Sequence, residues 1–244
     1  MRIGFVGTGT IASAVIEGIA ADGHQITVSR RSATRSGALA ARFDSVTVAD
    51  NQQVIDNSDV VVLGLMADQA ADILGGLTLR ADQQVISLMA GASLEAVARL
   101  VAPARAVAVM IPFPAIAQGG SPILLRGDAG LVRELFGVRN TIFELGSDAE
   151  LDAYMCAQAV LSPALRLVDD AADWAGARGA DRAGAEAFLR LLVGSSLLGS
   201  ETGPMLAALD TPGGYNQRLR NHMVNAGLTG DLRAGLDELA GDGS

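Results

Sequence analysis

The chain has 244 residues, of which 50% are hydrophobic and 18% charged, so it can bury a sizeable core in one large domain or two modest ones. Its formal net charge of −9 argues against nucleic acid or an anionic membrane as the main partner. It shows no apolar run long enough to span a bilayer and no secretory leader, so we expect a cytoplasmic protein.

Two features of the residue usage exclude classes of chemistry. Every basic residue is an arginine, and a chain without lysine cannot form a lysine Schiff base or use a lysine general acid. The single cysteine, Cys156, lies in an apolar helical stretch and has no second cysteine to pair with. We therefore expect a small core residue there, no redox cysteine chemistry and no metal site.

The N-terminal segment is an apolar strand followed by a glycine-rich turn. Residues 3–6 run into a Gly-x-Gly-x-x-Ala pattern whose small positions are Gly7, Gly9 and Ala12. Gly7 permits a sharp turn, Gly9 leaves room for a pyrophosphate, and Ala12 allows close helix–strand packing. The strand before the pattern and the one-turn spacing of apolar residues after it favour a dinucleotide site over an ordinary strand-turn-helix. The first helical N–H groups would then be free to bind phosphate. The expected contacts are Gly7, Thr8, Gly9, Thr10, Ile11 and Ala12.

The end of the second expected strand, residues 25–29, bears on which dinucleotide binds. An acidic residue at this point would bond the free ribose 2′-hydroxyl of NAD. Here the sequence is Ser29-Arg30-Arg31-Ser32, with Arg35 nearby. Guanidinium and hydroxyl groups match a 2′-phosphate, whereas a carboxylate would repel it. The segment predicts NADP, and the alternative is a solvated basic turn.

Strand and helix patterns continue to alternate up to residue 147. Further strands are expected at residues 46–48, 59–65, 85–89, 106–110, 122–125 and 141–145, and helices at residues 34–43 and 93–100. Near-continuous apolar strands are typical of a parallel sheet with helices on both faces. Pro112 and Pro114 are expected to stop the strand that precedes them. Residues 1–147 are thus predicted to form a doubly wound α/β domain.

From residue 148 onward the pattern is helical. Apolar residues between Phe188 and Leu198 surround most of one helix, which therefore needs a second packing partner. Burial within one chain is one explanation, and interlocking with the same region of another subunit is the one we favour. We expect residues 148–244 to form a helical domain that makes a homodimer or a higher homo-oligomer.

Several segments resemble the pyrroline-5-carboxylate reductase family, and the resemblance covers nearly the whole chain. Residues 7–12 and 29–30 match the family pattern, and residues 86–93 resemble its segment ending Ala-Ala-Gly-x-Ser. Residues 109–114 resemble its Val-Met-Pro-Asn-Thr-Pro turn, and residues 211–214 stand where it has Ser-Pro-Gly-Gly before two threonines. The last two matches are the most specific.

The resemblance implies a Rossmann domain followed by a helical dimerisation domain. It also implies NADPH-dependent reduction of a cyclic imine, 1-pyrroline-5-carboxylate to proline, by hydride transfer to the imine carbon. A protonated imine is already an electrophile, so catalysis can rest on positioning it and fixing its carboxylate. The Pro212-Gly213-Gly214 turn suits a carboxylate, because N–H groups at a helix start favour an anion. A plain helix-breaking turn is the alternative.

The chain departs from the family around the expected pocket. Residues 64–67, Gly-Leu-Met-Ala, replace Ala-Val-Lys-Pro, and Pro112 replaces the turn asparagine. Residues 159–163, Ala-Val-Leu-Ser-Pro, replace Ser-Gly-Ser-Gly-Pro, and Tyr215-Asn216 replace the paired threonines. The pocket is therefore expected to be bulkier and more apolar than in the family, which leaves the substrate more open than the fold.

The remaining site residues follow from these segments. The Tyr215 hydroxyl could donate a proton and Asn216 could hold a carboxylate or imine nitrogen, although both also suit a surface or an interface. Further cofactor contacts are expected at Leu65, Met66, Ala90, Gly91 and Pro112. Substrate contacts are expected at Ser162, Pro163, Thr211, Pro212, Gly213 and Gly214.

Two other functions stay open. A hydroxyacid or ketopantoate-type dehydrogenase shares the order of sheet and helices but relies on a lysine that this chain lacks. An NADP-binding sensor or scaffold would keep the cofactor half and lose the pocket, which fits the altered residues 159–163 and 215–216.

Overall fold

A computed structural model describes residues 1–30 and 33–242. The chain divides into two compact units, Met1–Leu151 and Asp152–Ser244. The boundary lies inside helix α7 (Asp148–Ala157). We call the first the sheet unit and the second the helical unit.

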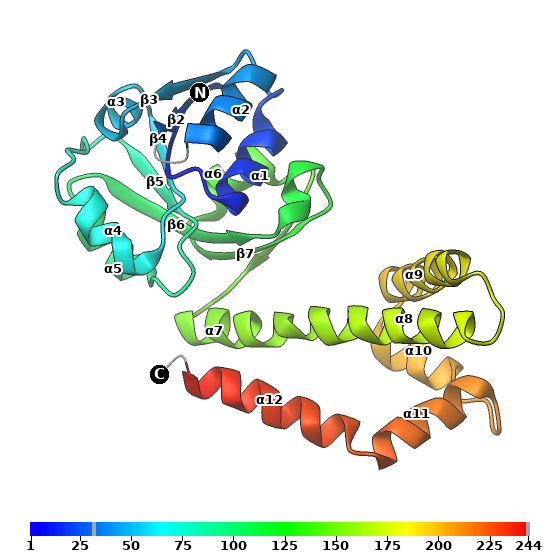
Figure 1. The fold of residues 1–244 in the computed structure, drawn as a ribbon. Helices are drawn as coiled ribbons and strands as arrows, with labels where there is room; N and C mark the ends of the chain where they lie inside the picture. Colours follow the sequence, from blue (N-terminus) through cyan, green and yellow to red (C-terminus); the bar gives the residue numbers. More distant parts are fainter. Residues whose placement is uncertain (31–32, 243–244) are drawn as a thin grey trace. The chain divides into compact units, whose positions relative to one another are not determined.

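The described residues of the sheet unit form one eight-stranded sheet in the order β3-β2-β1-β4-β5-β6-β7-β8 (Figure 1). The strands are β1 (Arg2–Val6), β2 (Gln25–Ser29), β3 (Val46–Ala49), β4 (Val60–Leu63), β5 (Gln84–Ser87), β6 (Arg105–Pro112), β7 (Pro122–Gly127) and β8 (Thr141–Glu144). All pairs from β3 to β6 are parallel, β7 is antiparallel to β6, and β8 is parallel to β7. The order 3-2-1-4-5-6 is that of a Rossmann-type sheet, which confirms the predicted fold class.

Helices connect the strands of this unit. They are α1 (Thr10–Ile19), α2 (Ala33–Arg42), α3 (Asn51–Asp56), α4 (Ala67–Leu74), α5 (Leu94–Val101), α6 (Ala129–Phe136) and the 3₁₀ helix η2 (Pro114–Ala117). The Ser93 side chain caps α5 as expected, accepting the Ala96 N–H at 3.1 Å. All four residues of β4 are buried, and only Val60 and Val62 belong to the core cluster that includes α1. Because side chains alternate along a strand, Val61 and Leu63 face the opposite side, so both faces of the sheet are covered.

The prediction that β6 would stop before its prolines was wrong for Pro112. The strand includes this residue, which pairs with Ile123 of β7. Pro112 is the last residue of the strand, where a missing N–H costs less than it would in the middle of a ladder. Pro114 opens η2 directly afterwards.

The helical unit contains helices throughout its described residues, as the sequence pattern predicted. After α7 come the 3₁₀ helix η3 (Gln158–Val160), α8 (Leu161–Gly176), α9 (Arg182–Gly199), α10 (Thr202–Ala208), α11 (Tyr215–Asn225) and α12 (Leu228–Asp242). Arg182 of α9 forms ion pairs with Asp169 and Asp173 of α8 and with Glu186 of its own helix. These contacts link the two helices of the α8–α9 hairpin at its surface. None of the described helices has both the length and the apolar character needed to cross a membrane.

The helical unit exposes much of its apolar surface. On α9, Phe188 is 62% exposed, Leu191 73% and Leu198 92%. Ala172 is the one fully buried apolar residue described beyond Leu151. The described residues of this unit therefore leave most of their large apolar side chains in contact with solvent in the single chain.

Candidate functional site

The glycine turn after β1 has the geometry that its sequence predicts. Gly7 adopts a φ of 96°, which disfavours any residue with a side chain. A Cβ on Gly7 would also lie 2.3 Å from the Gly64 carbonyl oxygen. Gly9 has nothing within 4 Å of its Cβ position and so leaves open space beside the backbone. The turn therefore closes tightly against the sheet and opens at Gly9.

The end of β4 packs directly on this turn. A Cβ on Gly64 would lie 2.7 Å from the Gly7 carbonyl oxygen and 2.8 Å from the Ala12 Cβ. Ala12 is fully buried, in agreement with the expected close helix–strand contact. Sequence reasoning treated Gly64 only as a departure from the family and missed this role. A glycine that ends an otherwise apolar strand was the available signal.

Ser29 lies beneath the glycine turn and bonds its backbone. The residue is fully buried, and its Oγ accepts the Gly7 N–H at 2.8 Å. The contact of Ser29 with the ribose end, expected together with Arg30, stays a prediction, and the structure shows that its hydroxyl already bonds the glycine turn. β2 is adjacent to β1, so its last residue reaches the glycine turn, whereas Arg30 is the first exposed residue beyond the strand.

The N-terminus of α1 is free to receive an anion. Gly9 is the N-cap and supplies no side-chain cap, and the first turn contains no acidic residue. The N–H groups of Thr10, Ile11 and Ala12 have no intrahelical acceptor and add to the positive end of the helix dipole. Among the described residues, the buried hydroxyl oxygens of Thr8 and Ser13 have no hydrogen-bond partner. Unpaired buried polar atoms are uncommon, and at a helix start they fit the phosphate groups of a dinucleotide.

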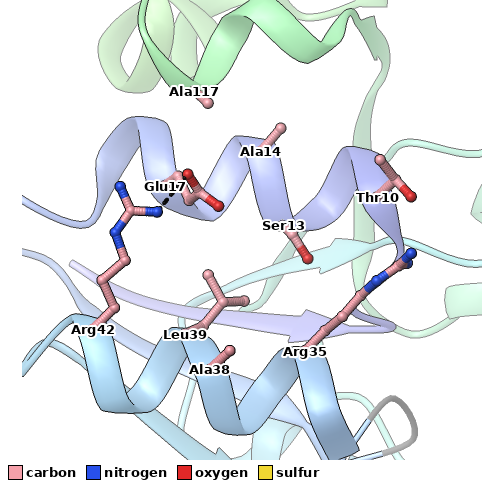
Figure 2. Close-up of a pocket in the computed structure, with 9 residues that line it drawn as sticks. All are labelled: Thr10, Ser13, Ala14, Glu17, Arg35, Ala38, Leu39, Arg42 and Ala117. Carbon is pink, nitrogen blue, oxygen red and sulfur yellow. Dashed lines mark hydrogen bonds and ion pairs between the residues drawn. The ribbon is translucent and has the colours of Figure 1, made fainter.

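A groove of about 390 Å³ runs between α1 and α2 (Figure 2). At one end, the Arg35 side chain extends from α2 toward the N-terminal end of α1, where Thr10 and Ser13 lie. At the other end, Arg42 forms an ion pair of 2.9 Å with Glu17. The groove thus has an ion pair at one end and, at the N-terminal end of α1, a guanidinium group without an ion-pair partner among the described residues.

Arg30 and Arg35 differ from the other described arginines of the sheet unit. Neither forms an ion pair with a described acidic residue, whereas each of the others does: Arg2, Arg42, Arg80, Arg99, Arg105, Arg126, Arg133 and Arg139. The uncompensated positive charge therefore lies after β2 and in the first turn of α2. Arg31 and Ser32, which the sequence also assigns to this site, lie outside the described residues.

The other expected cofactor contacts follow the carboxyl ends of β4, β5 and β6. Leu65 is buried, and its Cδ2 lies 3.0 Å from a Cβ placed on Gly7, whereas Met66 is 67% exposed. Ala90 and Gly91 are exposed after β5, and Pro112 is buried at the end of β6. Parallel strands end at one edge of a sheet, so these residues share the edge of the glycine turn. The strand order reverses between β1 and β4, the position at which such sheets bind ligands.

The turn at residues 211–214 differs from the expected carboxylate site. The Gly213 N–H donates to Gln217 Oε1 at 2.8 Å, and the Gly214 N–H donates to the Thr211 carbonyl oxygen at 2.9 Å. These two N–H groups are therefore engaged within the turn. The N–H groups left for an anion are those in the first turn of α11, which starts at Tyr215. Sequence reasoning missed Gln217, because an amide that closes a turn has no characteristic spacing.

The remaining expected substrate contacts lie on the surface of the helical unit. Tyr215 is 90% exposed, and Asn216 is also exposed. Ser162 and Pro163 are exposed in the first turn of α8. Among the described residues no group of His, Cys, Asp and Glu is arranged to hold a metal ion, and Cys156 is half-buried.

Comparison with known proteins relates this geometry to a family. Residues 2–91 match the family model described as "NADP oxidoreductase coenzyme F420-dependent". The pyrroline-5-carboxylate reductase of Corynebacterium melassecola is 26% identical to the chain, across 93% of this chain and 92% of that protein.

Two solved structures share the fold along the whole chain. The 1-pyrroline-5-carboxylate reductase of Streptococcus pyogenes superposes with a TM-score of 0.85 at 23% identity, covering 100% of this chain and 98% of that one. The pyrroline carboxylate reductase of Plasmodium falciparum, solved with NADP bound, gives a TM-score of 0.81 at 14% identity, covering 100% and 97%. These findings support an oxidoreductase whose N-terminal residues match an NADP oxidoreductase family model and whose sequence is similar to pyrroline-5-carboxylate reductases along nearly its whole length.

Proposed function

We propose that this protein is an NADPH-dependent imine reductase, with 1-pyrroline-5-carboxylate as its substrate and proline as its product. The observation that carries the proposal is the similarity to a pyrroline-5-carboxylate reductase over nearly the full length of both chains. We assign residues 1–147 to cofactor binding and residues 148–244 to substrate binding and dimerisation.

The sheet unit would hold the cofactor through backbone and guanidinium groups. The glycine turn, residues 7–12, would bind the pyrophosphate through its free N–H groups. The exposed guanidinium groups of Arg30 and Arg35 would bind the 2′-phosphate, with the sequence adding Arg31 and Ser32 to the same segment. The nicotinamide would lie by Met66, Ala90, Gly91 and Pro112, where bound NADPH supplies the hydride.

The helical unit would hold the imino acid. N–H groups in the first turn of α11 favour a carboxylate because they have no intrahelical acceptor. Ser162, Pro163 and residues 211–214 would complete the pocket, with the Asn216 amide orienting the substrate. The Tyr215 hydroxyl would donate a proton to, or hydrogen-bond, the imine nitrogen.

We propose that the protein is a homodimer formed through the helical unit. The exposed apolar side chains of α9 support this, as does a largely apolar groove of about 560 Å³ between α8 and α12, lined by Leu167, Leu228 and Leu232 among others. A second copy of the chain offers the same apolar faces in return, as a twofold interface requires. Molar mass measured by light scattering tests this point.

An NADP-binding sensor or scaffold is the second candidate. The replacements at residues 159–163 and 215–216 favour it. In the family these segments line the substrate pocket, and larger side chains there would reduce the space for a substrate. Incubation of the purified protein with NADPH and a panel of cyclic imines separates the two functions. Turnover supports the reductase, and NADPH binding without any turnover supports the sensor.

A further inference from the structure

The glycine turn has few side-chain contacts that could hold it in shape. Gly7 and Gly9 have no side chains, and the Thr8 hydroxyl has no described partner. Gly9 also provides no side-chain cap for α1. Among the described residues, the Ser29 Oγ is the one side-chain atom with an assigned hydrogen bond to residues 7–12.

The turn is instead held from the two strands that flank β1. On the β4 side, the Gly64 N–H donates to the Val6 carbonyl oxygen at 2.9 Å, and the glycines at 7 and 64 pack at close range. On the β2 side, the contact is the buried bond between Gly7 N–H and Ser29 Oγ. Gly7 adopts a φ of 96°, a conformation open to glycine, so an acceptor on its N–H selects one orientation of the peptide group.

We propose that Ser29 is a positioning residue for the cofactor, which preorganises the phosphate-binding turn without contacting the 2′-phosphate. Without its hydroxyl the Gly7 N–H is buried and unsatisfied, and the turn relaxes to satisfy it. The following N–H groups then no longer converge on one anion, so the cofactor must order the turn when it binds. This inference rests on the proposed dinucleotide site.

The two dinucleotides distinguish a positioning role of Ser29 from direct binding of the 2′-phosphate. NADH and NADPH share the pyrophosphate and differ at the 2′-position. A loosened turn therefore weakens both dinucleotides equally, whereas loss of a 2′-phosphate ligand weakens NADPH alone. A combined measurement of affinity and backbone exchange can distinguish these outcomes.

The test compares Ser29→Ala with Ser58→Ala. Ser58 is also fully buried, and its Oγ donates to the Val54 carbonyl oxygen at 2.6 Å at the other end of the sheet unit. The dissociation constants for NADPH and NADH should each rise about tenfold in Ser29→Ala and stay unchanged in Ser58→Ala. Amide hydrogen exchange at residues 6–9 of the cofactor-free protein should accelerate only in Ser29→Ala. Ser29→Thr, which keeps the hydroxyl, should restore the two dissociation constants and the slow amide exchange.

Two results with Ser29→Ala would overturn the positioning role. These are a loss of affinity confined to NADPH, and unchanged amide hydrogen exchange at residues 6–9. If Ser29→Ala does not fold, Ser29→Cys keeps the size of the side chain with a weaker acceptor and is judged by the same two readouts. A wild-type protein that binds neither dinucleotide contradicts the proposed function instead, while the exchange experiment still tests the turn.

Discussion

The Gly7 carbonyl oxygen lies 2.7 Å from the position that a Cβ on Gly64 would occupy, so two glycines meet where the turn after β1 crosses the end of β4. A side chain on either residue would force the two segments apart. This contact, together with the Ser29 bond from β2, places the glycine turn against its two neighbouring strands.

Gly64→Ala should therefore destabilise the protein. The added methyl would meet backbone at Gly7 and the Ala12 Cβ at 2.8 Å, and overpacking of this kind costs about 1–3 kcal/mol. Thermal unfolding of the variant, compared with Gly76→Ala, measures the effect. Gly76 has nothing within 4 Å of its Cβ position and a described φ outside the left-handed region. Equal melting temperatures for the two variants would contradict the close contact.

Replacement of Arg30 and Arg35 by alanine should change cofactor preference. Each charge-assisted hydrogen bond to a 2′-phosphate is worth about 1.5–3 kcal/mol, so NADPH affinity should fall about tenfold or more per arginine. NADH affinity should not change, because NADH lacks this phosphate. Isothermal titration with both dinucleotides measures the effect.

Arg99→Ala is the matched control for the arginine variants, since Arg99 pairs with Glu95 on the exposed face of α5. It removes the same charge from the sheet unit and should leave both affinities unchanged. If the Arg30 and Arg35 variants lose NADH and NADPH affinity equally, the two arginines do not recognise the 2′-phosphate.

Gln217→Leu should weaken binding of the substrate carboxylate more than it slows the chemical step. The variant frees the Gly213 N–H, which Gln217 Oε1 now accepts, and so loosens the turn that starts α11. The account predicts a higher KM for the imino acid at nearly constant kcat, and an unchanged KM for NADPH. Steady-state kinetics with each reactant varied in turn provide the data. A selective rise in the NADPH KM would show that this turn serves the cofactor.

A charge on the exposed face of α9 should disrupt the proposed dimer. Leu191→Glu places a carboxylate on a helix whose apolar side chains need a partner, and desolvating that charge at an interface is costly. Val138→Glu is the control, because Val138 is 96% exposed on the sheet unit. Light scattering should report a monomer for the first variant and a dimer for the second. A wild-type monomer would refute the dimer itself.

The sequence was sufficient to predict the fold class and the conformation of the glycine turn. Apolar runs predicted the parallel strands, and the small residues at positions 7, 9 and 12 predicted the turn. Strands and turn could both be predicted because each depends on a local sequence pattern. The side-chain roles at the strand ends were harder to predict. When both faces of a sheet are covered, Val28 and Ser29 are equally buried, so alternation does not reveal that Ser29 lies under the turn.

Long-range packing accounts for the other differences. Gly64 acts through a contact with Gly7, far away in the sequence, and no local pattern reports it. The helices of residues 148–242 were predictable from their composition, but the closure of the 211–214 turn by Gln217 depends on a single side-chain orientation. The sequence thus located the candidate cofactor segment better than it described the atoms available to a substrate.

The proposed activity of this chain is the reduction of a cyclic imino acid with NADPH. The most direct measurement is NADPH consumption by the purified protein with 1-pyrroline-5-carboxylate, paired with quantification of proline. The account predicts that one proline forms for each NADPH oxidised and that Tyr215→Phe lowers kcat. NADPH binding without oxidation, with this substrate and with related cyclic imines, would contradict it.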